Sequence, residues 1–221
     1  MSFAFALLAP CAIIASAAMA ATMPPVKMKV VDDEGKPVAG VVAFFTETAH
    51  QGTLTGHGGK SALLFAAEAV SDEGGELSFP RQEFTSHPFF LNTIHENPSM
   101  LFLKPGYAPL TLRNELRIMP TLAEASVWEK NGRTVTMKPA NKDDPYNMES
   151  WHIKQQTSLG VGTDPAACTW KKVPRTLVTA DRMYRDRESA LHMLLMNDAL
   201  FARHGCGSPG AFFAPYLESP K

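Results

Sequence analysis

The amino-acid sequence predicts a mainly β protein, with an antiparallel β-sandwich followed by a smaller α-helical C-terminal region. Three observations lead to this fold class. The 221 residues are 45% hydrophobic and 19% charged, which is typical of a globular protein. From residue 26 to residue 140, short apolar runs alternate with Gly, Pro and Asp turn residues, and after residue 141 apolar residues recur at helical spacing. We therefore expect a sandwich over residues 26–140 and a helical region over residues 141–221.

The first segment of the chain is predicted to be an export signal. Residues 3–21 are almost wholly apolar, and no charged side chain precedes Lys27. Ala18 and Ala20 supply the small residues that signal peptidase requires, so we expect a signal peptide over residues 1–20 and no membrane span after its cleavage. An uncleaved anchor is the alternative, because about 20 apolar residues can cross a bilayer. The predicted location is periplasmic or secreted.

The sandwich is predicted from short strands that end at turn residues. The predicted strands cover residues 26–31, 38–45, 63–70, 76–80, 100–103 and 108–112. The Asn131-Gly132 dipeptide predicts a hairpin between residues 127–128 and 134–137, because both turn positions tolerate positive φ. About seven short strands of this kind are typical of an antiparallel sandwich. The longest loops are expected at residues 47–61 and 81–98.

Three ordered turn motifs in this region resemble a known family. They lie in segments 30–43, 70–80 and 104–107, and read Asp32-x-x-Gly35, Asp72-x-x-Gly75 and Lys104-Pro105-Gly106-Tyr107. Together they resemble the carboxypeptidase regulatory-like domains of bacterial exported proteins. The resemblance covers about residues 26–139. It implies a transthyretin-like (prealbumin-like) sandwich and no peptidase activity.

Three helices are predicted after the sandwich. A short one begins near Asp144 and Pro145, which suit a helix start, and ends before Gly160. A second is expected over residues 175–184 and a third over residues 186–204, with Gly205 as its stop. The tail over residues 207–221 contains three prolines and is predicted to be irregular.

Cysteine usage agrees with export. Loss of Cys11 with the signal leaves Cys168 and Cys206, and exported proteins more often pair two cysteines than leave them free. A disulfide between them would stabilise the fold by about 3–4 kcal/mol in the chain-entropy model. The alternative is a pair of buried free thiols.

Charge and motif content exclude several classes of function. The 21 Lys+Arg nearly balance the 22 Asp+Glu and form no basic block, so no nucleic-acid binding is predicted. Residues 56–61 resemble a phosphate loop, but Leu54 stands where its first glycine is required. The chain has no Gly-x-Ser-x-Gly motif, and its four tyrosines do not follow the iron-binding pattern of intradiol dioxygenases. We therefore predict no catalytic residue, no cofactor and no enzyme activity.

Three hypotheses for function remain. The first is a non-catalytic exported protein that binds an envelope protein or supports envelope structure. The second is a metal-dependent enzyme, because neutral imidazole is a common ligand for zinc and copper. Its candidate ligands lie in the two long predicted loops: His50, His57, His87 and His95. The third is a carbohydrate-binding module in which tryptophan rings stack on a glycan.

The residues for stacking would be Trp128, Trp151 and Trp170. One further motif, His192 with Met193 and Met196, contains donors that suit copper, because thioether sulfur is a soft ligand. Methionines at helical spacing more often fill a hydrophobic core. The motif therefore favours a buried helix face over a copper site.

Overall fold

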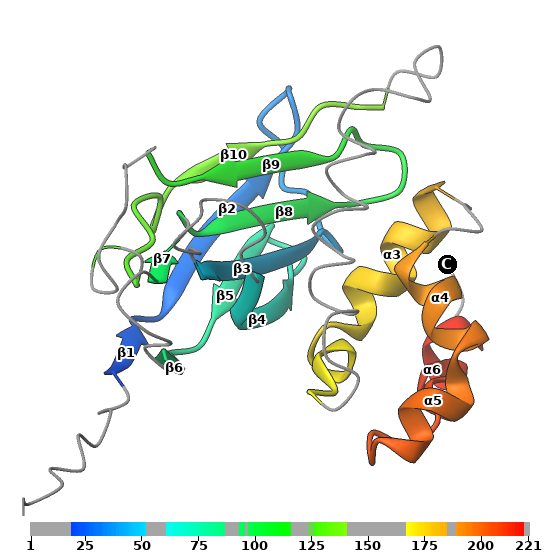
Figure 1. The fold of residues 1–221 in the computed structure, drawn as a ribbon. Coiled ribbons are helices and arrows are strands. Elements are labelled where there is room, and N and C mark those ends of the chain that lie inside the picture. Colours follow the sequence, from blue (N-terminus) through cyan, green and yellow to red (C-terminus); the bar gives the residue numbers. More distant parts are fainter. Residues whose placement is uncertain are drawn as a thin grey trace, which may run out of the picture.

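A computed structural model describes residues 19–51, 61–86, 93–95, 97–115, 124, 126–140, 167–184 and 189–218. Over these residues the chain is mainly β with a helical C-terminal region, as the sequence predicts (Figure 1). The strands are β1 (Met19–Met23), β2 (Val26–Val31), β3 (Val42–Gln51), β4 (Ser61–Val70), β5 (Glu76–Phe79), β6 (Gln82–Ser86), β7 (Thr93–His95), β8 (Ser99–Leu103), β9 (Leu110–Arg113) and β10 (Thr134–Thr136). The helices are the 3-10 helix η1 (Thr169–Lys172), α3 (Pro174–Tyr184), α4 (Ala190–Met196), α5 (Asp198–Arg203) and α6 (Pro209–Glu218).

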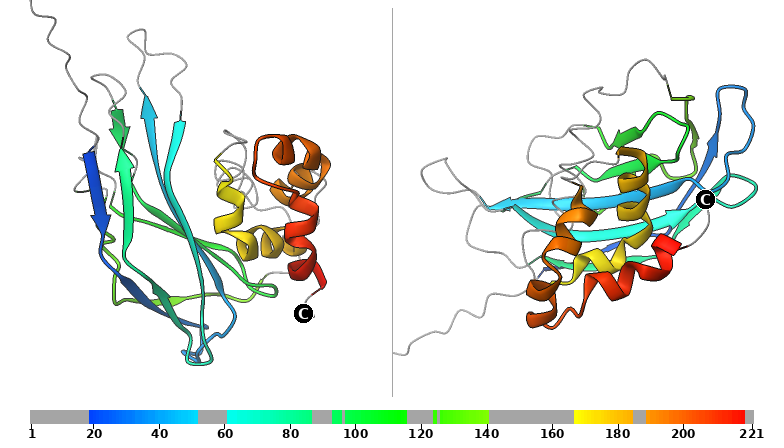
Figure 2. Two further views of the ribbon diagram at one scale, coloured as in Figure 1. Left: turned by 90° about the horizontal axis from the view of Figure 1, so that it is seen from below. Right: turned by 90° about the vertical axis from the view of Figure 1, so that its right-hand side faces the viewer.

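The strands form three sheets. The largest has the order β4-β3-β8-β9, with β7 also paired to β3, and the others are β10-β2-β5 and β1-β6. The first two pack face to face around one apolar cluster, which gives a sandwich-like body. Figure 2 shows the helices as a further layer on the outer face of the largest sheet.

The middle strands of the largest sheet are buried on both faces. Successive side chains of a strand point to opposite faces. Phe45 and Met100, which are paired across β3 and β8, face the sandwich cluster. Their neighbours Phe44 and Leu101, also paired, face the helices. The apolar run over residues 100–103 therefore follows from contact with two cores.

The second core joins the helices to this sheet. Trp170 is 1% exposed, and its ring lies against those of Phe201, Phe212 and Phe213 with centroids 6.2, 5.0 and 5.7 Å apart. The same cluster includes Leu177 of α3 and residues of β3, β4 and β8. The helical region is thus packed on the sheet. No helix within the described ranges is long and apolar enough to cross a bilayer.

The first strand overlaps the predicted signal cleavage point. β1 pairs with β6, from Met19 opposite Ser86 to Met23 opposite Gln82. Cleavage after Ala20 would leave the pairs formed by residues 21–23, and Met23 is completely buried.

The hairpin predicted at Asn131-Gly132 is wrong, because β10 pairs in parallel with β2. The Asn131 side-chain oxygen accepts a hydrogen bond from the backbone N–H of Lys27 at 2.8 Å, and the N–H of Gly132 donates to the Lys27 carbonyl at 2.7 Å. The dipeptide therefore binds the backbone at the start of β2, and the chain that follows it forms β10 at the edge of that sheet.

Two helical predictions also need correction. The single helix predicted over residues 186–204 is divided into α4 and α5 at Asn197. The tail predicted to be irregular contains α6, in which Pro209 is the first residue and Phe213 is completely buried. Proline is tolerated at the first helical position because its missing N–H would have no intrahelical partner. The helix predicted near residues 145–159 lies outside the described residues.

The two Asp-x-x-Gly motifs form equivalent turns. The carboxylates of Asp32 and Asp72 each accept two backbone N–H bonds at 2.8–3.0 Å. Gly35 and Gly75 have φ values of 79° and 75°, in the left-handed region that favours glycine. A Cβ atom on Gly75 would lie 2.3 Å from the Val30 carbonyl oxygen, whereas one on Gly35 would meet nothing within 4 Å.

Gly75→Ala is therefore expected to lower the free energy of unfolding by at least about 3 kcal/mol, because left-handed strain adds to a backbone clash. Gly35→Ala is the matched control and should cost only about 1–2 kcal/mol, since it introduces the strain without the clash. Urea unfolding followed by circular dichroism measures both. Equal losses would show that the approach of Val30 does not constrain the fold.

Candidate functional site

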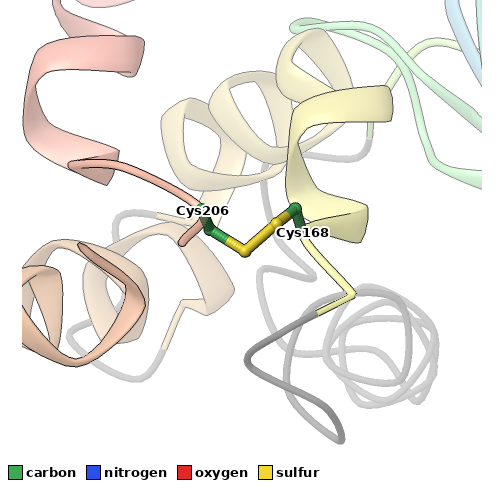
Figure 3. Close-up of a disulfide and its surroundings, with 2 residues drawn as sticks. All are labelled: Cys168 and Cys206. Atoms are coloured by element: carbon green, nitrogen blue, oxygen red, sulfur yellow. A yellow bond between two sulfur atoms is a disulfide. The ribbon is translucent and has the colours of Figure 1, made fainter. Parts of the chain in front are cut away.

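Cys168 and Cys206 form a disulfide, as the cysteine count predicts (Figure 3). Their Cα atoms are 5.4 Å apart, and Cys206 is completely buried in the helical core. The bond connects the start of η1 with the segment after α5. It therefore fastens the beginning of the helical layer to a position 38 residues later in the chain.

The four histidines proposed as metal ligands are not all within the described residues. His50 lies in β3 and His95 in β7, so the prediction that they lie in loops is wrong. The reason is that β3 continues to Gln51 and pairs there with β4 and β7. In this register His50 is opposite Ile94, and His95 is opposite Ala49.

His57 and His87 fall outside the described residues. Among the described residues, no group of three or more His, Cys, Asp or Glu side chains could hold a metal ion.

The tryptophans proposed to stack on sugars are core residues where they are described. Trp128 is 3% exposed and Trp170 1% exposed. The Trp128 indole N–H donates to the sulfur of Met28 at 3.3 Å, and its ring packs edge-on against Phe45 at 4.9 Å. Neither indole is therefore available to a glycan. Trp151 lies outside the described residues.

A groove of ≈ 570 Å³ lies where α3 and α6 meet the ends of β3 and β4. Its lining combines apolar side chains with two arginines: Val42, Val70, Arg175, Val178, Thr179, Arg182, Pro215 and Tyr216. Val42 and Val70 are paired at the first position of β3 and the last of β4. The groove therefore has an apolar floor at the sheet and a wall from α3 that carries two guanidinium groups, and none of the described residues that line it is acidic.

Both arginines belong to one face of α3. Arg182 lies seven positions after Arg175, which is close to two helical turns and about 10 Å along the axis. Arg175 is exposed. The Arg182 guanidinium donates to the backbone carbonyl of Tyr216 at 3.0 Å, which fixes it at the junction of α3 and α6. Two guanidinium groups beside an apolar floor can bind an apolar ligand that carries two carboxylates.

Glu68 of β4 holds the N-terminus of α3 beside the groove. Its Oε1 accepts from the backbone N–H of Arg175 at 3.1 Å, and its Oε2 accepts from the N–H and the hydroxyl of Thr176 at 2.8 and 3.0 Å. Burial raises the pKa of Glu68, while these hydrogen bonds and the charge of Arg175 act in the opposite direction. The first amides of a helix have no intrahelical acceptor, so Glu68 serves as a cap supplied by the sheet.

A second carboxyl group, Glu47, is buried in the middle of β3. It is 1% exposed and stands opposite Phe65, just before a register shift in the pairing of β3 with β4. Alternation along β3 places it on the same face as Phe45, towards the sandwich cluster. Burial raises the pKa of Glu47 to about 8, so the group is mainly protonated at neutral pH. Glu47 does not line the groove.

Sequence reasoning did not identify Glu47, Glu68, Arg175 or Arg182. Some signals were present, because Glu68 is the only charged residue in the apolar run 62–70 and the two arginines share one helix face. The contact of Glu68 with α3 spans 107 residues and has no local signal.

No family model matches the chain, and no curated protein matches it. One similar solved structure is 3-chlorocatechol 1,2-dioxygenase from Rhodococcus opacus 1CP, at 15% identity and a TM-score of 0.32, covering 54% of this chain and 60% of that one. Another is chlorocatechol 1,2-dioxygenase from Pseudomonas putida, at 12% identity and a TM-score of 0.29, covering 55% and 61%. The chain therefore spans about three fifths of the length of these enzymes. At such low TM-scores, neither similarity indicates what this protein does.

Glu68→Ala is expected to lower the free energy of unfolding by about 1–2 kcal/mol, because the first amides of α3 lose their acceptor. Glu68→Gln should recover only part of this loss, since an amide offers one acceptor oxygen in place of two. Glu73→Ala, in an exposed turn, is the control and should be close to neutral. Urea unfolding measures all three variants, and a neutral Glu68→Ala would contradict the capping role.

Glu47 is expected to make the protein less stable as pH rises. The pKa of Glu47 in the folded protein, about 8, lies above the ordinary value of 4.5. Its contribution to the free energy of unfolding is therefore complete below pH 4.5 and is lost as pH rises through 8. Between these values, the free energy of unfolding should fall by about 1 kcal/mol per pH unit on account of this group.

Glu47→Gln should remove that slope, whereas Glu76→Gln, at an exposed position, should retain it. Urea unfolding at a series of pH values tests the prediction. An unchanged slope in Glu47→Gln would assign the pH dependence to other groups.

Proposed function

We propose that this protein is a non-catalytic recognition protein of the cell envelope, periplasmic or secreted, whose groove binds an acidic and partly apolar segment of a partner protein. The observation that carries the proposal is the pair Arg175 and Arg182 on one face of α3, above a floor that contains Val42 and Val70. This combination favours ligands that carry both carboxylates and aliphatic side chains.

The spacing of the arginines favours an extended peptide. A polyproline II segment has three residues per turn and rises about 3.1 Å per residue, so carboxylates three positions apart lie on the same side of the chain and are separated by about 9 Å. This is close to the rise of about 10 Å along α3 between Arg175 and Arg182. Guanidinium groups bind carboxylates with two parallel hydrogen bonds, which adds orientation to charge attraction. An extended segment of the type acidic, apolar, apolar, acidic therefore fits the groove.

The walls of the groove are held in place before any ligand binds. Glu68 ties the first turn of α3 to β4, and Arg182 ties its last turns to the chain at Tyr216. A pre-organised wall lowers the entropy that binding must overcome. These contacts support binding of the ligand by the rigid wall of the groove, and not by flexible loops.

Two further parts of the proposal rest on the sequence together with the disulfide. Disulfides persist in oxidising compartments, so the Cys168–Cys206 bond supports export by the N-terminal segment. The sandwich is proposed to be of the transthyretin-like type found in carboxypeptidase regulatory-like domains, and the ordered turn motifs at Gly35 and Gly75 support this. Neither part assigns a peptidase activity.

The binding proposal is tested with a fluorescein-labelled peptide, Gly-Glu-Leu-Leu-Glu-Gly, by fluorescence anisotropy. We expect saturable binding that weakens as salt is raised, because exposed ion pairs are screened. The double variant Arg175→Gln/Arg182→Gln should bind at least about tenfold more weakly, a loss of about 1.4 kcal/mol. Arg203→Gln, on α5, is the matched control and should bind like the unaltered protein.

A second control peptide carries Gln in place of both Glu residues and should not bind. Absence of binding by the acidic peptide, or equal affinity of the double variant and the unaltered protein, would contradict the proposal.

A further inference from the structure

One face of α4 carries soft metal-ligating side chains in solvent. Met193 is 58% exposed and Met196 72% exposed, whereas Leu191 and Leu194 are 2% and 1% exposed. The buried leucines therefore provide the core contact of this helix. The two methionines are not core filler, which is the ordinary role of methionine in a helix.

His192 belongs to the same surface. Each helical residue is rotated by about 100° from the one before it, so His192, Met196 and Met193 fall within an arc of about 100°, with Met196 between the others. Residues three and four apart on a helix have Cβ atoms about 5–6 Å apart. His192 is partly exposed. One imidazole and two thioether groups are thus presented to solvent from a single turn.

The turn that carries these donors is fixed to the rest of the helical layer. The Ser189 hydroxyl accepts a hydrogen bond from the backbone N–H of His192 at 3.1 Å and donates to Asp181 of α3 at 2.6 Å. Leu191 and Leu194 anchor the opposite face in the core that contains Trp170. The three donors therefore stand on a rigid support, which lowers the conformational cost of gathering them around an ion.

We propose that His192, Met193 and Met196 form a binding site for a soft monovalent cation, Cu(I) or Ag(I). Thioether sulfur is a soft ligand that favours Cu(I), and imidazole nitrogen also binds copper. Magnesium and calcium require oxygen ligands, which none of these three side chains supplies. The site is separate from the groove residues and does not depend on the proposed function.

Silver ion is the probe, because it needs no reductant and so leaves the disulfide intact. The background variant is Cys11→Ser: of the three cysteines in the chain, Cys168 and Cys206 are bonded, so no free thiol then competes for silver. Silver nitrate is titrated into this protein in chloride-free buffer. Calorimetry gives the affinity and stoichiometry, and the NMR signals of 13C-labelled methionine methyl groups identify the ligands.

We expect one equivalent of silver to bind and to shift the methyl signals of Met193 and Met196 among those of the 11 methionines. Met193→Leu/Met196→Leu should weaken binding at least about tenfold, and His192→Phe should weaken it in the same direction. Met183→Leu, which removes a thioether from α3, is the matched control and should leave affinity unchanged.

Circular dichroism checks that each variant is folded. Unchanged affinity in the double methionine variant, shifts confined to other methionines, or no binding by the folded background protein would each overturn the proposal.

Discussion

The structure depends on a sheet whose middle strands serve two cores at once. In β3 and β8, each residue that faces the sandwich is followed by one that faces the helices, as the pairs Phe45 with Met100 and Phe44 with Leu101 show. A shift of register by one residue would exchange the two sets of side chains, so the helical layer and the second sheet both constrain the same pairing. The helices therefore contribute to the register of the sheet that supports them. The groove between the ends of that sheet and α3 follows from this packing.

Three contacts fix the helices to one another and to the sheet: the disulfide, the Glu68 cap of α3, and the hydrogen bond from Arg182 to Tyr216. The disulfide is the strongest in principle, at about 3–4 kcal/mol in the chain-entropy model, whereas a helix cap such as Glu68 contributes about 1–2 kcal/mol. The weaker contact has the more specific effect, because Glu68 determines where the first turn of α3 meets β4 and hence where Arg175 stands. Covalent closure limits how far the layer can open, and the cap with the Arg182 contact at Tyr216 determines the shape of the groove. Disulfides persist in oxidising compartments, so the covalent tie is compatible with the proposed export.

Local signals predicted most strands and one helix well, and failed where the partner lay far along the chain. The strands at residues 26–31 and 63–70 agree closely with β2 and β4, because alternation and turn residues are properties of neighbouring positions. Asn131-Gly132 marked a turn but could not reveal that the following strand pairs with β2 in parallel. Glu68 was only an isolated charge in an apolar run, since its partners are 107 and 108 residues away. The disulfide was predictable because only two cysteines follow the predicted signal peptide.

The sequence placed the candidate metal ligands in two long loops, whereas the arginine and methionine side chains of the two proposed binding sites lie on helices. This difference has a physical cause. The sequence suggested loops over residues 47–61 and 81–98, but parts of both segments are strands, since β3 continues to Gln51 and β6 and β7 lie in the second segment. Extension of β3 makes Glu47 a core residue, where a carboxyl group is stable chiefly in its neutral form. The helical layer can instead expose charge and sulfur, because each helix buries one face against the sheet or its neighbours and leaves the other in solvent. A surface built in this way can carry different binding groups on separate helices, guanidinium hydrogen-bond donors on α3 and the proposed soft metal ligands on α4, without disturbing the sandwich below.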